Sequence, residues 1–219
     1  MNSQVVKKNN IYLSRQFLPS VIWAIVLLSF SFWFSYLAND YANKTANNQV
    51  TDLILSNTPV FNVNLIVVYG PILLMLFLIG LLAIRPQTIP FTLKSMALFV
   101  AVRAVFMSLT HIAQFYPQAL LDSGPFINLL GAGNQGGLFF SGHTGLPFLL
   151  AIIFWDNKKI RLIFLGASIL FGVSLLLGHL HYSIDILGAF FITYSISTMS
   201  KRLFAKDFVI FHKGLSGTI

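Results

Sequence analysis

The chain has 219 residues, of which 56% are hydrophobic and only 9% are charged. About a quarter of the residues of a soluble domain are charged, so this composition excludes an ordinary soluble domain and predicts an integral membrane protein. The absence of cysteine and glutamate excludes disulfides, thiolate metal sites, cysteine nucleophiles and any mechanism that needs a buried glutamate. The acids are all aspartates: Asp40, Asp52, Asp122, Asp156, Asp185 and Asp207.

Basic residues give the chain a formal net charge of +8, but they are scattered between apolar stretches instead of clustering. We therefore expect no nucleic-acid partner. Scattered Lys and Arg are better explained as the positive charge that membrane proteins carry in their cytoplasmic loops.

Six apolar stretches reach the roughly 20 residues that a transmembrane helix needs. In chain order they are Leu18–Leu37, Phe61–Ile84, Phe91–Phe115, Leu138–Trp155, Ile160–Leu180 and His181–Met199. The first stretch lacks the small-residue cleavage site of a signal peptide, so we expect it to be retained. The predicted fold is all-α, a polytopic membrane protein with six transmembrane helices and no separate soluble domain.

Two places in these stretches break the regular pattern. Gly70-Pro71 interrupts the second span, where a kink is tolerated if neighbouring helices satisfy the freed carbonyls. The loop Gln114–Gly137 ends in a glycine-rich segment, which can re-enter the membrane surface and bring its backbone close to a ligand.

Six spans place both termini on the same side of the membrane, and the positive charges indicate which side. Only Lys44 lies in a loop on one face, whereas the other face carries Lys7, Lys8, Arg15, Arg85, Lys94, Lys158, Lys159, Arg161, Lys201, Arg202, Lys206 and Lys213. The positive-inside rule therefore predicts cytoplasmic termini. We divide the chain into a cytoplasmic segment 1–17, a membrane domain 18–200 and a basic cytoplasmic tail 201–219.

Two polar motifs lie within residues 138–185, each at the start of a predicted span. They are Phe140-Ser141-Gly142-His143-Thr144 and His181-Tyr182-Ser183-Ile184-Asp185. Both helix N-termini would face the periplasm, the exterior or an organelle lumen, where their unpaired N–H groups favour an anion such as a lipid phosphate. Ser141 is suited to cap and donate, and Gly142 lets the backbone approach the anion.

The spacing of His181 and Asp185 puts both side chains on one helix face. The carboxylate can then hold one imidazole nitrogen as N–H and leave the other as a nucleophilic lone pair. His143 could protonate the leaving oxygen and later activate the acceptor. This scheme is a two-step phosphoryl transfer through a phosphohistidine that requires no metal or other cofactor, and the sequence offers no acidic cluster for Mg²⁺.

Ser-Gly-His-Thr followed some forty residues later by His-Tyr-Ser-x-Asp resembles the lipid phosphate phosphatase (type 2 phosphatidic acid phosphatase) superfamily, and within it the sphingomyelin synthase-like branch. The resemblance covers the third to sixth spans. It implies that His181 is the nucleophile, Asp185 its partner and His143 the acid and base. Arg103 occupies a place similar to an arginine in the third span of synthase-like members, and we assign it with Ser141 and Gly142 to phosphate binding.

The chain departs from the family pattern at three places. The Lys-x6-Arg-Pro motif of the phosphatase branch is absent, because Arg85-Pro86 has no lysine ahead of it. Ser174-Leu175 stands where that branch has Ser-Arg, and Gln135-Gly136-Gly137 stands where animal synthases have Cys-Gly-Asp. The missing basic residues argue against a small, fully ionised phosphomonoester as the substrate. Because the Asp of the animal synthases is missing, the motif does not predict which lipid headgroup is selected.

The resemblance thus implies a lipid phosphotransferase that acts on a membrane phospholipid or lipid phosphate, with a lipid alcohol as acceptor. With water as acceptor the same site would make a lipid phosphatase. A non-catalytic lipid-binding or transport homologue is a further alternative, whereas a cation channel or transporter would need more intramembrane acids than Asp185.

Individual residues also have alternative interpretations. Arg103 and Asp185 could simply pair for packing, since buried charges in spans are costly. His179, His181 and Asp185 could be metal ligands only if the turn is unwound, because residues two apart on a helix point to opposite sides. Tyr182 and Ser183 are expected to pack at the interface, with Ser183 within reach of a phosphate.

Overall fold

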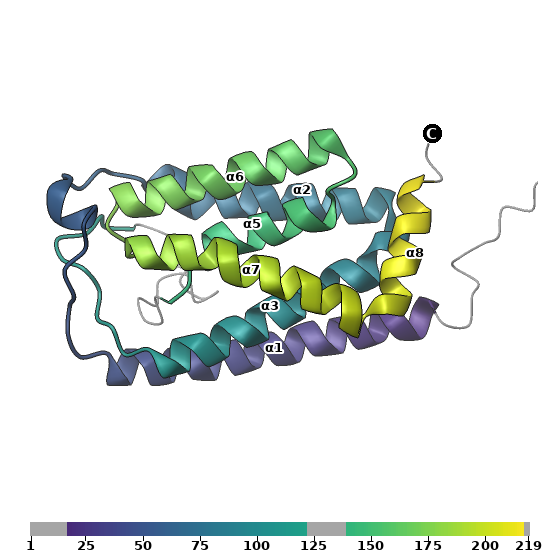
Figure 1. Cartoon of the computed structure of the whole chain (residues 1–219), viewed down its shortest axis with the longest axis horizontal. Coiled ribbons are helices and arrows are strands. Elements are labelled where there is room, and N and C mark those ends of the chain that lie inside the picture. Colours follow the sequence, from purple (N-terminus) through teal and green to yellow (C-terminus); the bar gives the residue numbers. More distant parts are fainter. Residues whose placement is uncertain (1–16, 122–138, 217–219) are drawn as a thin grey trace, which may run out of the picture.

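The computed structural model describes residues 17–121 and 139–216, and in these residues it is helical without a β-strand (Figure 1). The α-helices are α1 (Phe17–Thr45), α2 (Gly70–Ile84), α3 (Ile89–Leu109), α5 (Gly142–Ile153), α6 (Lys158–Leu177), α7 (Ser183–Leu203) and α8 (Ala205–Ser216). Shorter turns lie at η2 (Leu55–Asn57), η3 (Leu65–Tyr69) and η4 (Pro86–Thr88).

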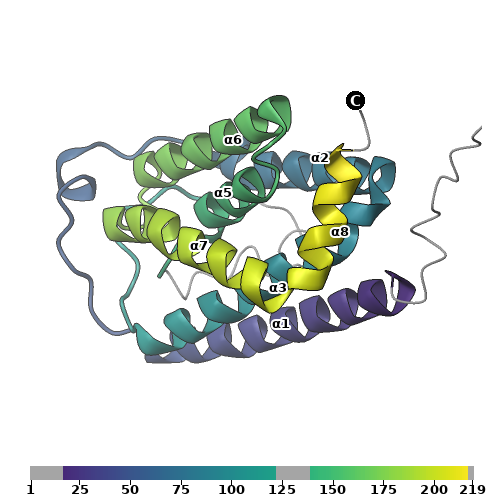
Figure 2. The same cartoon turned by 45° about the vertical axis from the view of Figure 1, so that its right-hand side comes forward.

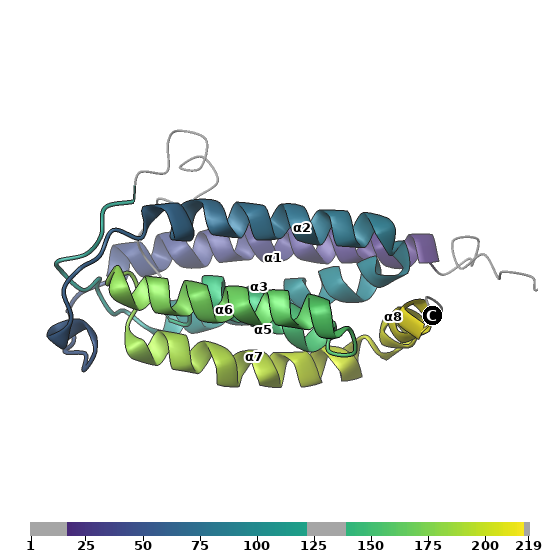
Figure 3. The same ribbon diagram turned by 90° about the horizontal axis from the view of Figure 1, so that it is seen from above.

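The helices α1, α2, α3, α5, α6 and α7 run side by side and alternate in direction (Figures 1 and 3). α5 lies within this bundle, and seven of its twelve residues are buried. α8 turns across the end of the bundle where α1 begins (Figure 2). We call the opposite end, where α5 and α7 begin, the site end.

Four helical segments in the described ranges are long and apolar enough to cross a membrane: Phe17–Thr45, Leu65–Ile84, Pro86–Leu109 and Lys158–Leu177. They support an integral membrane protein, as the composition predicts. α5 has only 12 residues, and α7 is more polar, with Ser, Thr and Asp along its 21 residues. The count of six spans and the cytoplasmic position of the termini therefore stay predictions.

Helix boundaries differ from the sequence-based ranges where polar residues make local contacts. α1 continues to Thr45 through a polar stretch, because Ala38 and Ala42 are buried in the bundle, and Lys44 pairs with Asp40 at 2.6 Å on the exposed side. α3 ends at Leu109 instead of Phe115, where Thr110 adopts an extended conformation. The fourth predicted span narrows to α5, since Ser141 caps it at Gly142.

The predicted interruption at Gly70-Pro71 coincides with a change of helix type. The π-helical turn η3 runs directly into α2, and Pro71, which has no N–H to continue the hydrogen-bond ladder, is the second residue of α2. Gly70 is also a close-packing point, because a Cβ there would lie 2.5 Å from the Phe171 ring of α6.

The core contains many aromatic rings and extends under α8. Phe91, Phe99, Phe140, Phe154, Phe164 and Phe211 are all fully buried. Phe211 belongs to α8, a helix that our sequence analysis did not assign to the tail. The helix is also held by an ion pair in which Lys94 Nζ lies 2.6 Å from Asp207. α8 therefore packs on the bundle instead of extending from it.

Candidate active site

The start of α7 holds His181 beside Asp185. The helix begins at Ser183 and not at His181 as predicted, so His181 lies two residues ahead of it and the pair meets across the N-cap instead of sharing a helix face. Tyr182 is the N-cap residue, and Asp185 accepts its backbone N–H at 3.0 Å. The same carboxylate oxygen lies 3.3 Å from Nδ1 of His181. Asp185 is 1% exposed and His181 8% exposed, so the pair is shielded from solvent. When Nδ1 carries the proton, the Nδ1–H group donates a hydrogen bond to the carboxylate. The lone pair on Nε2 is then free to act as a nucleophile.

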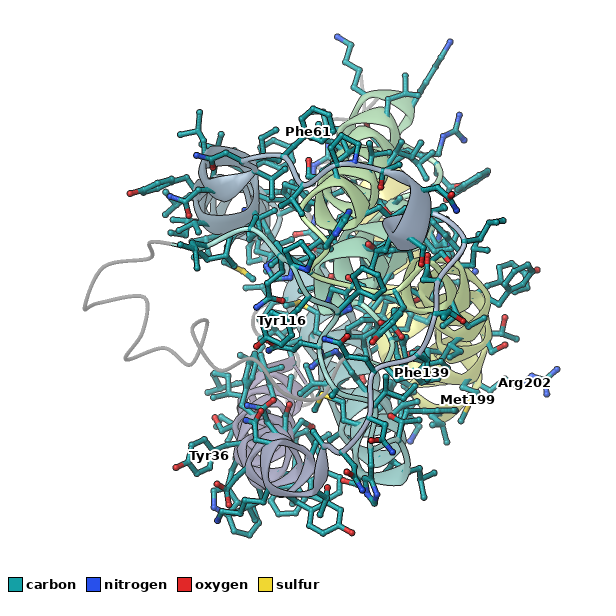
Figure 4. All side chains as sticks on the ribbon, turned by 90° about the vertical axis from the view of Figure 1, so that its left-hand side faces the viewer. Tyr36, Phe61, Tyr116, Phe139, Met199 and Arg202 are labelled. Carbon is teal, nitrogen blue, oxygen red and sulfur yellow. The ribbon has the colours of Figure 1, made fainter. Side chains whose placement is uncertain are left out.

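The first turn of α5 lies beside this pair. Ser141 caps α5 by accepting the Thr144 N–H at 3.3 Å, as its place in the motif predicts. Its own N–H donates to the Asp185 carbonyl at 3.2 Å, which joins the two polar motifs directly. In Figure 4, which looks onto the site end, the labelled Phe139 precedes this junction, and its ring lies near Gly188 of α7.

Arg103 reaches the junction from α3. Its Nε–H donates to the Phe140 carbonyl at 2.9 Å. A Cβ at Gly142 would lie 3.4 Å from the same nitrogen, an ordinary van der Waals distance, so the guanidinium lies against the start of α5. Arg103 also interacts electrostatically with Asp185. The arginine is therefore held at the motifs by a backbone hydrogen bond.

His143 occupies the second position of α5, half-buried, with its ring edge-on to Phe171 at 6.4 Å between centroids. It interacts electrostatically with both His181 and Arg103. Within the described part of the chain, no hydrogen bond is found from the N–H of His143 or of Gly142. These two N–H groups lie at a helix N-terminus beside the Arg103 guanidinium, which is the kind of position that favours an anion.

Asp52, which the sequence analysis counted only among the six aspartates, also belongs to the site end. One carboxylate oxygen accepts the Ser183 N–H at 2.8 Å and the Ser183 hydroxyl at 2.7 Å. The other accepts the N–H groups of Ile54 and Leu55 at 2.9 and 3.1 Å. An Asp ahead of a short helical turn is a capping signal, but nothing in the sequence marks Ser183 as its distant partner. Both the N–H and the hydroxyl of Ser183 thus donate to Asp52 in this structure, and neither donates elsewhere in these contacts.

Two further residues of the second motif region bind loops. Tyr182 is buried, and its hydroxyl donates to the Ala113 carbonyl at 2.8 Å. His179 adopts a positive φ of 56°, and its ring nitrogens lie 3.0 Å from the Pro117 carbonyl and 3.3 Å from the Thr58 hydroxyl. The ring of His179 therefore faces these loops and does not converge with His181 and Asp185 as the metal interpretation requires.

The predicted glycine-rich loop falls mostly outside the described residues, because 122–138 are not among them. Asp122 and Gln135-Gly136-Gly137 therefore lie outside the described residues.

Comparison with protein families gives one finding. Residues 136–202 match the family model described as PAP2 superfamily C-terminal. The matched segment contains both motifs but covers less than half of the chain. It supports the lipid phosphate phosphatase superfamily and the lipid phosphate chemistry that goes with it. No curated protein and no solved structure matches the chain significantly.

Proposed function

We propose that the protein is a membrane-embedded lipid phosphotransferase that moves a phospho-headgroup from a membrane lipid to a lipid alcohol, as sphingomyelin synthase-like enzymes do. The observation that carries the proposal is the 3.2 Å hydrogen bond from the Ser141 N–H to the Asp185 carbonyl. It joins the helix start that bears His143 to the one that bears His181. The family match over residues 136–202 supports phosphate chemistry on the same segment.

The first step forms a covalent phosphohistidine. His181 Nε2 attacks phosphorus, a P–N bond forms, and the P–O bond to the lipid oxygen breaks. His143 gives its proton to that oxygen, so the donor lipid leaves as a neutral alcohol. Asp185 accepts the Nδ1 proton of His181 in a hydrogen bond throughout, which stabilises the positive charge that develops on the ring.

The second step reverses these roles. The acceptor hydroxyl gives its proton to His143 and attacks phosphorus. A P–O bond forms as the P–N bond breaks, and His181 returns to its starting state. The N–H groups of Gly142 and His143, the Ser141 cap and the Arg103 guanidinium hold the phosphate oxygens in both steps.

The amount of positive charge available to bind a phosphate favours a phosphodiester as the substrate. The Lys-x6-Arg-Pro motif of the phosphatase branch is absent and Leu175 stands where that branch has an arginine, which leaves Arg103 as the cation at the described motifs. A phosphodiester headgroup carries less negative charge than a phosphomonoester and needs less compensation. This supports the transferase assignment over a phosphatase that acts on small phosphomonoesters.

We also propose that the site opens toward the periplasm, exterior or lumen. α5 and α7 begin at the site end, whereas Arg85, Lys94, Lys158, Lys201 and Arg202 lie on helix ends or beginnings at the opposite end. By the positive-inside rule, that opposite end faces the cytoplasm.

A phosphatase with water as acceptor is the second candidate, and the PAP2 match favours it. The same residues would perform the first step, and water would replace the lipid alcohol in the second. A non-catalytic homologue has no use for a carboxylate-oriented histidine, so the intact His143, His181 and Asp185 speak against that alternative.

The test uses the purified full-length chain in lipid nanodiscs that contain headgroup-labelled phosphatidylcholine, with and without ceramide. We expect labelled product in the wild type and its loss in His181→Ala and His143→Ala. His212→Ala is the matched control, since this exposed histidine also lies 3.3 Å from an aspartate, Asp156. Circular dichroism checks that the variants remain folded.

Product analysis by mass spectrometry separates the candidates. A labelled sphingolipid that needs ceramide identifies the transferase, and a released phosphorylated headgroup identifies water as acceptor. Full turnover in both histidine variants would overturn the catalytic assignment.

A further inference from the structure

The loop between α1 and α2, residues 46–64, is bound to the turn that leads into α7. Four contacts fasten it, from the Val50 N–H to the Tyr182 hydroxyl, from Ser183 to Asp52, between Thr58 and His179, and from the Phe61 N–H to the Leu177 carbonyl. This loop lies outside the segment 136–202 that matches the family model. Residues far from the motifs in sequence therefore hold the backbone on which His181 lies.

Asp52 is the charged residue in this set, and its carboxylate is fully used. It is 8% exposed and accepts four hydrogen bonds, two from Ser183 and one each from Ile54 and Leu55. All four partners are donors, so the ionised carboxylate is the form that satisfies them. A neutral amide of the same shape would turn an N–H₂ group toward donors.

The position of Ser183 makes this contact important for the site. Ser183 is the first residue of α7 and lies midway between His181 and Asp185. Its N–H is among those that have no partner within a helix, and Asp52 supplies one. Asp185 accepts the preceding N–H, that of Tyr182. Two carboxylates thus fix two successive peptide groups of the segment that sets the distance between His181 and Asp185.

We propose that Asp52 is a positioning residue of the active site, which acts through Ser183 to hold the start of α7 so that Asp185 can orient the His181 ring. The catalytic part of this inference rests on the proposed function. Asp52 itself touches neither His143 nor His181 in the contacts described above, so it acts on geometry and not on the phosphate.

The isosteric variant Asp52→Asn is the central experiment. It keeps the shape of the side chain but turns an amide N–H₂ toward one pair of donors. A shift of the α7 start by about 1 Å costs on the order of 100-fold in rate, so we expect kcat to fall about 10–100-fold. We expect KM for the lipid donor to change less than about threefold, because the groups that hold phosphate lie on α3 and α5.

A second readout is independent of activity. In the full-length protein labelled with ¹⁵N-histidine in detergent micelles, the Nδ1–H resonance of His181 is assigned by its loss in His181→Gln. The Nδ1 proton is buried from solvent and hydrogen-bonded to Asp185, so it exchanges slowly with water in the wild type. Asp52→Asn should move this resonance upfield or broaden it, because the contact between Nδ1 and the carboxylate loosens. A role that only stabilises the fold would leave this resonance in place in the folded variant.

The matched control is Asp40→Asn. Asp40 is also an aspartate near the site end, but it pairs with Lys44 on the exposed surface of α1. Neither kcat nor the His181 resonance should change. Ser183→Ala removes one of the four hydrogen bonds and should give a smaller loss, which Ser183→Thr restores because it keeps the hydroxyl.

An unshifted His181 resonance in Asp52→Asn overturns the inference, whatever the rate does. If Asp52→Asn does not fold, Ser183→Ala decides by the same two measurements. If the wild type turns over no lipid, the proposed function fails, and the resonance alone still decides whether Asp52 positions His181.

Discussion

The backbone N–H of Ser141 donates to the backbone carbonyl of Asp185 at 3.2 Å. Asp185 therefore links the two motifs: its side chain accepts the Tyr182 N–H and lies against His181, and its carbonyl holds the start of α5. His143 lies two residues after Ser141 on that helix. The two histidines are thus connected through one aspartate.

Replacing Asp185 by asparagine should reduce turnover more than it reduces lipid binding. The amide oxygen can still accept from both His181 Nδ1 and the Tyr182 N–H, but the amide carries no negative charge to stabilise the positive charge that develops on the His181 ring. An amide N–H₂ turned toward the ring would in addition favour the wrong tautomer, so we expect kcat to fall on the order of 10²–10⁴-fold. Steady-state kinetics with headgroup-labelled phospholipid measures the loss.

The control for this variant is Asp156→Asn. Asp156 lies 3.3 Å from His212 with 61% of its side chain exposed, which reproduces the histidine–aspartate distance away from the site. It should keep wild-type kinetics. Equal losses in both variants would show that the effect is not specific to the His181 pair.

Arg103→Lys tests whether the guanidinium does more than supply charge. Lysine keeps the positive charge but has no Nε–H to donate to the Phe140 carbonyl, so the cation loses its anchor beside Gly142. We expect kcat/KM to fall by about 10–100-fold, which corresponds to a loss of about 1.4–2.7 kcal/mol of transition-state stabilisation. Activity assays over a range of lipid concentrations give this ratio.

Arg161→Lys is the corresponding control, because Arg161 also donates to a backbone carbonyl, that of Trp155, at 3.1 Å. This pair lies at the end of the bundle away from the motifs. A wild-type kcat/KM in Arg103→Lys would remove Arg103 from the phosphate site and leave it a structural role.

Much of the helix arrangement was predictable because membrane spans depend on local properties. Apolar length located the helices, and Ser141 marked the start of α5 by its capping chemistry. The extension of α1 was missed because an Asn-rich stretch is typical of a loop, whereas packing of Ala38 and Ala42 holds it helical. In that case tertiary contacts outweighed composition.

The contacts between loops were not predictable for a different reason. Asp52 and Ser183 are joined only once the chain has folded, and neither lies in a spacing pattern with the other. The same holds for α8, whose burial of Phe211 depends on the core it meets. The identity of the candidate residues was thus accessible from motifs, while the residues that support them required the structure.

Gly145 in α5 should not tolerate a side chain. A Cβ there would lie 2.7 Å from the Phe99 ring and 2.9 Å from the Thr193 hydroxyl oxygen. Gly145→Ala is therefore expected to overpack the contact between α3, α5 and α7 and to destabilise the fold by about 1–3 kcal/mol. Thermal unfolding in detergent, followed by circular dichroism, measures the change in Tm.

Gly166→Ala provides the comparison, since no atom lies within 4 Å of a Cβ at that position in α6. Alanine has the higher helix propensity, so this variant should be neutral or more stable by up to about 1 kcal/mol. A Tm for Gly145→Ala equal to or above that of Gly166→Ala would contradict the close packing of α5.

Asp52 should make stability depend on pH in a defined acidic range. Burial on its own raises the pKa of this carboxyl, but the hydrogen bonds from the Leu55 N–H and from Ser183 outweigh burial and lower the pKa below its usual value of 3.8. The unfolded chain therefore binds the proton first on acidification. The stabilisation is fully present above pH 3.8 and is lost as pH falls through the lower folded-state pKa.

The measurement compares Tm of the wild type and Asp52→Asn in detergent from pH 7 down to about pH 3, a range that includes the usual carboxyl titration. The difference between the two proteins isolates Asp52, because the other carboxyls titrate in both. We expect a constant advantage of the wild type down to about pH 5 and a smaller one below pH 4. Asp40→Asn, which alters an exposed carboxyl, should follow the wild type throughout. An advantage that grows toward low pH would mean that Asp52 is protonated in the folded protein, because only a raised pKa stabilises the fold in acid.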